Sequence, residues 1–268
     1  MRIIFPALLA VLASGASAQD AAQNEALARA GQRGALLYAY DQAAWHGTDD
    51  MFAKLKDPAN KIGGYIVDGP VAAPRLIFFD KTGQTAVYIA TFSDNRLVSG
   101  RVLGEDEDRA LSPLDRRMVL ALGTARAAIS ADSNARPCVP KPFNTVVLPP
   151  ESADGPVRVY FLTPQTDTAM VPFGGHYEVD VDAEGNAGSI HHFSKSCLNL
   201  PARSNLPARA KTKAMFVTHL LDPVPTEVHV FNSLALRMPI MVGTVPSKMI
   251  WTVTGDKIGT PVPFPTEP

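Results

Sequence analysis

Apolar residues recur at three- and four-residue steps over residues 19–46, which is the spacing of one face of a helix. The residues that keep this spacing are Leu27, Leu36, Leu37, Tyr40, Ala44 and Trp45. Gly31 and Gly34 interrupt the pattern, so we predict that the helix divides into two pieces there. The polar residues 48–50 then predict the cap of a short second helix over residues 51–56.

The pattern changes over residues 62–103, where short runs rich in β-branched and aromatic residues are separated by turn residues. Residues 80–83 and 94–95 have the Asp, Asn and Gly content of tight turns. We therefore predict four short antiparallel strands in a meander. They are placed at residues 63–67, 75–79, 85–92 and 96–103.

A further helix is predicted to begin directly after Ser112. Ser112 supplies an N-cap oxygen, Pro113 suits the first helical position, and Asp115 places an acid at the third. The apolar spacing continues to Ile129, and the helix is expected to end near residues 132–134.

A second unit follows a proline-rich boundary at residues 137–142. Its strands are placed at residues 143–148, 157–162, 177–181, 187–193, 211–220, 238–244 and 249–253. A helix is predicted over residues 227–236. A strand–helix–strand connection of this length makes residues 213–220 and 238–244 parallel neighbours. The proline-rich residues 261–268 are predicted to be a frayed tail.

These elements predict an α+β protein, because clusters of strands alternate with helices. The length of 268 residues allows one large domain or two small ones. We predict two units: a helix–antiparallel meander–helix unit over residues 19–135 and a mixed-sheet unit over residues 138–260.

The first eighteen residues have the three parts of a secretory signal peptide. Arg2 gives the positive start, residues 3–13 form the apolar run, and residues 16–18 are a small-x-small cleavage site. We expect the mature chain to begin at Gln19 and to be periplasmic or secreted. No later stretch approaches the roughly 20 apolar residues that a spanning helix needs, so no transmembrane segment is expected.

The composition is that of an ordinary globular protein. Hydrophobic residues make up 46% and charged residues 19% of the chain, which excludes a disordered polypeptide. The net charge is −1, and Lys and Arg are scattered among acids without a basic run. A nucleic-acid partner is therefore not expected.

The chain has two cysteines, Cys138 and Cys197. In an oxidising compartment a disulfide between them is the simplest expectation. Two buried free thiols are the alternative, and a catalytic cysteine is less favoured because neither residue lies in a Cys-x-x-Cys or other nucleophile motif.

The common catalytic signatures are absent from the sequence, among them Gly-x-Ser-x-Gly, the phosphate loop, the dinucleotide-binding glycines and His-Glu-x-x-His. Histidines nevertheless concentrate in the second unit. They are His176, His191, His192, His219 and His229. A zinc site needs three or four such ligands that converge, and no two of these histidines have a ligand spacing on one element.

The segment from Thr218 to His229 resembles the motif of the JAB/MPN zinc metallopeptidases, His-x-His-Pro-x(6)-Ser-x-x-Asp, and the RadC-like bacterial branch in particular. In that branch an Asp-Pro-Thr-Pro-Ser segment precedes the helix that carries an Asp ligand. Residues 222–226, Asp-Pro-Val-Pro-Thr, stand in that place. The resemblance covers residues 157–258 and implies a JAB-like fold for the second unit.

The residues at the motif positions differ from those of the family. Val217 occupies the position of the first ligand His and His219 that of the second, while Leu220 replaces the Pro. Thr226 stands for the Ser and His229 for the Asp ligand, and the upstream catalytic Glu has no counterpart that we can place. The resemblance thus implies a degenerate metal site in which His229 faces His219 across a small gap.

Three interpretations of function follow. The first is a secreted, non-catalytic globular protein with a binding or structural role in the cell envelope, without a cofactor and with an unidentified protein or envelope ligand as its partner. The second is a periplasmic zinc-dependent hydrolase whose metal is held by His176, His219, His229 and one further group. The third is an inhibitor or immunity-like partner of another secreted protein. Convergence of the three histidines in an open cleft would favour the hydrolase.

Overall fold

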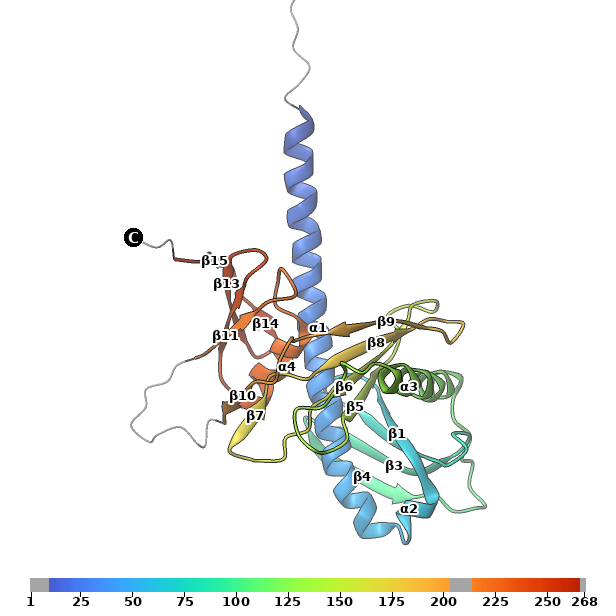
Figure 1. The fold of residues 1–268 in the computed structure, drawn as a ribbon. Coiled ribbons are helices and arrows are strands. Elements are labelled where there is room, and N and C mark those ends of the chain that lie inside the picture. Colours follow the sequence, from blue (N-terminus) through green and yellow to red (C-terminus); the bar gives the residue numbers. More distant parts are fainter. Residues whose placement is uncertain (1–9, 203–213, 266–268) are drawn as a thin grey trace, which may run out of the picture.

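The computed structural model describes residues 10–202 and 214–265, and these form an α+β fold, as the sequence predicted. Its helices are α1 (Ala10–Lys54), α2 (Pro58–Lys61), α3 (Pro113–Ala131) and α4 (Glu227–Leu236). Figure 1 shows α1 running along both groups of strands, with its N-terminal part extending beyond them. Residues 1–9 of the predicted signal peptide lie outside the described residues, and its remainder is the start of α1.

Helix α1 is continuous, so the predicted break at Gly31 and Gly34 is wrong. Both glycines lie where α1 touches other backbone: a Cβ at Gly31 would lie 2.7 Å from the carbonyl oxygen of Asp256, and one at Gly34 would lie 2.7 Å from that of Glu227. A glycine costs a helix about 1 kcal/mol. Close packing of α1 offsets this cost, so the glycines mark contacts and not a helix end.

The short second helix predicted over residues 51–56 is also wrong, because α1 itself continues to Lys54. Residue 48 does not cap a new helix. The Thr48 hydroxyl donates to the carbonyl oxygen of Ala44, one turn earlier, at 2.5 Å. The Thr48 side chain therefore bonds to the backbone within α1 and does not cap a new helix.

The predicted meander is confirmed as an antiparallel sheet in the order β1-β2-β3-β4. Its strands are β1 (Ile62–Asp68), β2 (Arg75–Asp80), β3 (Ala86–Ser93) and β4 (Arg96–Val102). Asp94 and Asn95 have positive φ angles of 47° and 61°, as a two-residue hairpin turn requires.

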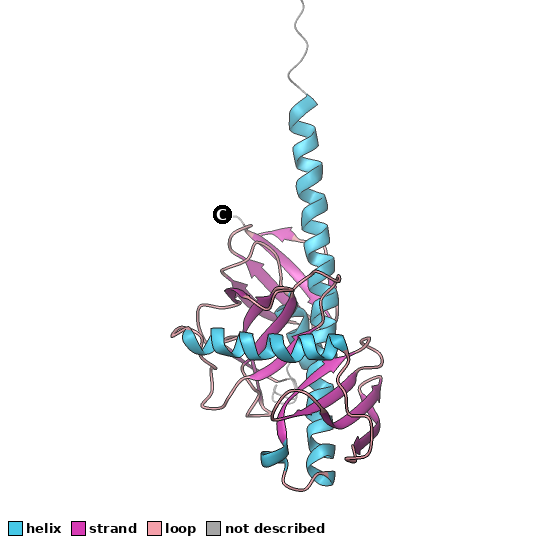
Figure 2. Cartoon of the chain, turned by 90° about the vertical axis from the view of Figure 1, so that its right-hand side faces the viewer, coloured by secondary structure: helices cyan, strands magenta, loops and turns pink. Residues whose placement is uncertain are grey.

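Helix α3 begins as predicted. The Ser112 hydroxyl accepts a hydrogen bond from the Asp115 N–H at 3.1 Å, and the Asp115 carboxylate accepts one from the Ser112 N–H at 3.1 Å. This reciprocal capping box satisfies two of the N–H groups at the helix start. Figure 2 shows α3 lying crosswise to α1.

A second antiparallel sheet has the order β5-β6-β8-β9. Its strands are β5 (Asn144–Leu148), β6 (Val157–Leu162), β8 (Tyr177–Val181) and β9 (Ala187–His192). Hydrophobic clusters join the two antiparallel sheets: one contains Leu37 and Leu76 with Tyr160, and the other contains Ile77 and Met118 with Val179. Packing is thus continuous across the predicted boundary between the units.

The third sheet is mixed. It contains β11 (Met215–His219), β12 (Ile240–Thr244), β13 (Met249–Thr254), β14 (Lys257–Ile258) and β15 (Val262–Pro263). Strands β7 (Met170–Pro172) and β10 (Asn199–Pro201) pair with each other in a separate two-stranded antiparallel sheet. Strands β11 and β12 are parallel neighbours with α4 between them in the sequence, which confirms the predicted crossover. Residues 211–213, which the sequence placed at the start of the strand that corresponds to β11, lie outside the described residues.

The predicted frayed tail is partly wrong, because Val262 and Pro263 form β15 and pair with β13. The Phe264 N–H donates to the carbonyl oxygen of Lys248 at 2.9 Å, and the Phe264 ring lies against Gly243. Proline is tolerated in this strand because it lies at the edge of the sheet. Residues 266–268 of the predicted tail lie outside the described residues.

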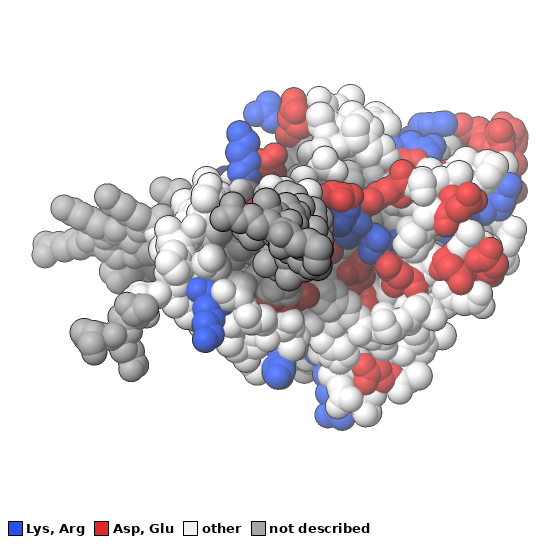
Figure 3. Space-filling view, turned by 90° about the horizontal axis from the view of Figure 1, so that it is seen from above, with Lys and Arg blue, Asp and Glu red and all other residues white. Residues whose placement is uncertain are grey.

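The predicted disulfide between Cys138 and Cys197 is present, with the two Cα atoms 5.5 Å apart. Within the residues that the structure describes, no helix has both the length and the apolar character needed to cross a membrane. Acidic and basic side chains are interspersed on the face of the molecule drawn in Figure 3.

Candidate functional site

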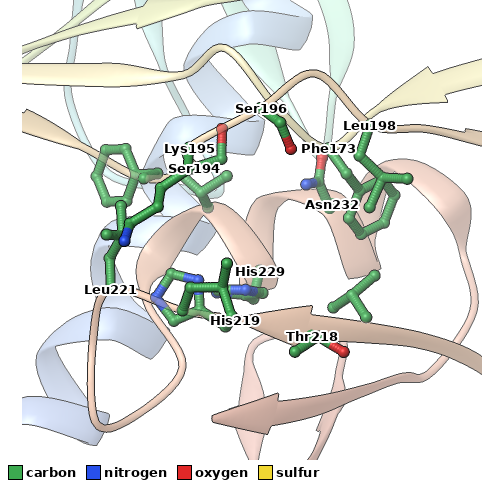
Figure 4. Close-up of a pocket in the computed structure, with 14 residues that line it drawn as sticks. Phe173, Ser194, Lys195, Ser196, Leu198, Thr218, His219, Leu221, His229 and Asn232 are labelled. Carbon is green, nitrogen blue, oxygen red and sulfur yellow. The ribbon is translucent and has the colours of Figure 1, made fainter. Parts of the chain in front are cut away.

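A cavity of about 80 Å³ lies beside α4, under the segment that joins β9 to β10 (Figure 4). Its apolar wall includes Phe173, Leu198, Val217 and Val228. Its polar lining consists of Ser194, Lys195, Ser196, Thr218, His219, His229 and Asn232. Two of the three predicted metal-ligand histidines therefore lie at one site.

The disulfide holds one wall of this cavity. Cys197 lies between Ser196 and Leu198, which both line the cavity, and it is bonded to Cys138. A side chain at Gly175, where φ is 69°, would place its Cβ 2.5 Å from the sulfur of Cys138. The backbone packs tightly around the disulfide, so the crosslink restricts movement of this wall of the cavity.

His219 and His229 face each other as the resemblance implied, with ring centroids 4.6 Å apart. His229 is the third residue of α4, and its Nδ1 accepts a hydrogen bond from the Thr226 N–H at 3.1 Å. This is the position at which a capping box usually has Glu or Gln. Because Nδ1 is an acceptor, the neutral ring has its proton on Nε2. Burial, together with the nearby His219, lowers the pKa of His229 to about 3.

His219 contacts the first member of a chain of charged groups that leads away from the cavity. Its Nε2 lies 2.8 Å from Oδ2 of Asp222, whose Oδ1 lies 3.4 Å from Nε2 of His191. Nδ1 of His191 in turn lies 3.7 Å from Oε2 of Glu178. The carboxylates of Asp222 and Glu178 raise the pKa of His191 to about 10. Burial opposes ionisation of Asp222, but hydrogen bonds from the two histidines prevail and hold its pKa well below the usual range.

His176 does not share this arrangement. Its Nδ1 accepts a hydrogen bond from the Thr163 N–H at 3.2 Å, and its Nε2 lies 3.2 Å from the carbonyl oxygen of Pro172, to which it donates. Burial lowers the pKa of His176 to about 4. Over residues 10–202 and 214–265, no group of three or more His, Cys, Asp or Glu side chains has an arrangement that could hold a metal ion.

Asn232 is the least expected residue at the cavity. It lies one helical turn after His229 on α4 and is 1% exposed. Neither its Oδ1 nor its Nδ2 has a hydrogen-bond partner within the described part of the chain. The next residue, Ser233, is equally buried but donates to the carbonyl oxygen of Met238 at 3.0 Å and accepts from the Gly255 N–H at 3.0 Å.

A second, larger hollow of about 580 Å³ lies on the other side of the charged chain, between α1, β9 and residues 222–227. There the Tyr160 hydroxyl donates to Oε1 of Glu227 at 2.7 Å, and Arg158 lies 2.9 Å from both Glu178 and Asp180. Burial raises the pKa of Glu227. Positive and negative groups in this hollow are largely paired with each other.

The sequence pattern led to His219 and His229 but not to Asp222, His191 or Asn232 as site residues. Asp222 was part of the motif but was not assigned a role. Asn232 follows His229 by one helical turn, so the helical spacing could have placed Asn232 beside His229. The contact between His191 and Asp222 joins β9 to the loop after β11, and no local pattern reveals it.

Comparisons with protein-family models, with curated proteins and with solved structures found no match to this chain. The function is therefore inferred from the site itself.

Proposed function

We propose that this chain is an exported, non-catalytic binding protein of the bacterial cell envelope, and that the cavity beside α4 is its ligand site. The proposal rests on one observation, the buried and unpartnered amide of Asn232 on the cavity wall. A buried polar group without a partner costs about 1–3 kcal/mol. An apolar residue of similar shape would be more stable at this position, so stability does not explain the asparagine, whereas a polar ligand does.

The histidine geometry supports binding over catalysis. A metal ligand must present a nitrogen lone pair. His176 has both ring nitrogens engaged by the backbone, and His229 has its lone pair on Nδ1, where Thr226 donates to it. His219 alone keeps a nitrogen, Nδ1, that is not engaged in the hydrogen bonds with Asp222. The hydrogen bonds of His219 and His229 stabilise the end of β11 and the start of α4.

The leader-like first eighteen residues and the disulfide support the location. Structural disulfides form and persist mainly in oxidising compartments such as the periplasm.

Binding is tested by NMR on the ¹⁵N-labelled mature chain. Acetamide, acetate, ethylammonium and ethanol are added separately to about 50 mM, because ligands of so few atoms bind weakly. At least one probe is expected to shift the signals of Thr218, His219 and Asn232. If none of the four probes shifts these signals, the cavity is not a ligand site.

A matched pair of variants controls for effects elsewhere. Leu198 lines the cavity and is 40% exposed, whereas Leu114 is the second residue of α3 and is 39% exposed. The bulky ring in Leu198→Trp is expected to fill the cavity mouth and remove the probe shifts, and Leu114→Trp is expected to leave them unchanged. Equal effects of the two variants would contradict the assignment.

Adding zinc chloride to the mature chain tests the alternative function. The alternative, a periplasmic zinc-dependent hydrolase of JAB-like fold, predicts one tightly bound zinc per chain. It also predicts zinc-dependent peptide cleavage that His219→Ala or His229→Ala abolishes. Our proposal predicts neither, and either result would replace it with the alternative.

A further inference from the structure

The cavity offers a ligand one specific set of polar atoms. The amide of Asn232 presents an acceptor, Oδ1, and a two-proton donor, Nδ2, in one plane, and both are unused in the described part of the chain. Figure 4 places Asn232 between the apolar side chains of Phe173 and Leu198 on one side and the two histidines on the other. The group that fits Asn232 must donate and accept side by side.

Among the described residues that line the cavity, Lys195 is the one Lys, Arg, Asp or Glu side chain, and it is exposed. Burial keeps His229 uncharged, since its pKa is lowered to about 3. The negative charge of Asp222 is paired with protonated His191, 3.4 Å away, whose pKa is raised to about 10. The buried lining residues that the structure describes include no Lys, Arg, Asp or Glu that could pair with an ion beside Asn232, and a carboxylate would face Oδ1 without a proton to donate. A neutral ligand is favoured.

The volume limits the part of the ligand that is enclosed. A cavity of about 150 Å³ holds benzene, with six carbon atoms. The cavity here is about 80 Å³, which suits a group of three or four heavy atoms. Lys195 and Ser196 line it and are exposed, so a larger ligand can extend past them into solvent.

We propose that the cavity binds a neutral primary carboxamide, which pairs with the Asn232 amide through two antiparallel N–H···O hydrogen bonds. This rests on the proposed binding function and names its ligand class. The carboxamide belongs either to a free small molecule or to the side chain of an Asn or Gln residue in a peptide. The two sources share the same chemistry.

The first experiment measures selectivity on the unaltered mature chain. Acetamide and acetate have the same number of heavy atoms and the same shape, and acetamide is expected to bind about tenfold more tightly in the NMR titration. The tripeptide Gly-Gln-Gly distinguishes the sources, since it binds more tightly than acetamide only if a peptide side chain is the natural ligand. If acetate or ethylammonium binds at the cavity as tightly as acetamide, the carboxamide proposal is wrong while the binding function stands. If no probe binds, both are wrong.

The second experiment separates a ligand-binding role of Asn232 from a structural one. Asn232→Leu has nearly the same shape and removes the unpartnered atoms, so it should be at least as stable to urea as the parent and should lose acetamide binding. The adjacent Ser233→Ala is the control. It removes hydrogen bonds to Met238 and from Gly255, and should lower stability without changing acetamide affinity. An Asn232→Leu variant that still binds acetamide would show that the amide does not hold the ligand, and one that loses stability as Ser233→Ala does would show that the amide has a structural role; either result would overturn the proposal.

Discussion

The contact between α1 and α4 gives a sharp test of how this fold is packed. Gly34 is buried against α4, and a Cβ there would lie 2.7 Å from the Glu227 carbonyl oxygen and closer still to the side chain of Val230. Gly123 is also inside a helix, α3, but is exposed and has nothing within 4 Å of its Cβ position. Changing each glycine to alanine thus compares the same substitution with and without crowding.

Both substitutions gain about 1 kcal/mol of helix propensity. Gly123→Ala should therefore be more stable than the parent by up to about 1 kcal/mol. In Gly34→Ala an added methyl group in a packed contact costs about 1–3 kcal/mol. The upper part of that range applies, because the Glu227 carbonyl belongs to the backbone of α4 and cannot rotate aside. We expect Gly34→Ala to be less stable than the parent by about 1–2 kcal/mol.

The assay is urea denaturation of both variants, followed by circular dichroism and by the fluorescence of the buried Trp251. The free energies of unfolding of Gly34→Ala and Gly123→Ala should differ by about 2–3 kcal/mol. If the two variants are equally stable, α1 does not approach α4 this closely, and the packing argument for a continuous α1 is refuted.

Three further predictions concern the crosslink, the charged chain and export. Replacing Cys138 and Cys197 by serine should lower the free energy of unfolding by about 4 kcal/mol in urea melts, because the bond closes a loop of 59 residues, and an unchanged midpoint would contradict this. His191 has a raised pKa of about 10, so its ion pair with Asp222 stabilises the protein below pH 6.5 and the contribution is lost as the pH rises towards 10. We expect a loss of about 1 kcal/mol over this range, since the side chain is 40% exposed and solvent screens the pair; a pH profile that is the same in His191→Gln would disprove it. Protein isolated from cells should begin at Gln19 by N-terminal sequencing, and an intact Met1 would rule out export by this signal.

Sequence patterns correctly predicted those helices and strands that are determined by residues close together in the sequence. The run Val157–Leu162 is strand β6, and Glu227–Leu236 is helix α4, with the bounds expected from apolar spacing. The capping box at Ser112 likewise depends on residues three positions apart. In these cases the neighbours that decide the structure are also neighbours in the sequence.

The predictions that were wrong, or that missed a residue, concern features whose causes are distant in the sequence. Gly31 and Gly34 ordinarily weaken a helix, and only their contacts with Asp256 and with α4 explain why α1 continues through them. Strand β15 forms from proline-rich residues because β13 has a free edge to pair with. At the site, the amide of Asn232 is notable for the partners it lacks, and a missing partner cannot be predicted from spacing.

Because Cys197 lies in the cavity wall, the shape of the site depends on whether the two cysteines have been oxidised. Ser196 and Leu198 are held in place through a bond that forms only after oxidation. A chain that is exported as proposed would cross the membrane with this wall untethered. It would become competent to capture its ligand only once the thiols have been oxidised outside the cytoplasm. The enzymes that introduce disulfides would then control when, and in which compartment, the protein begins to function.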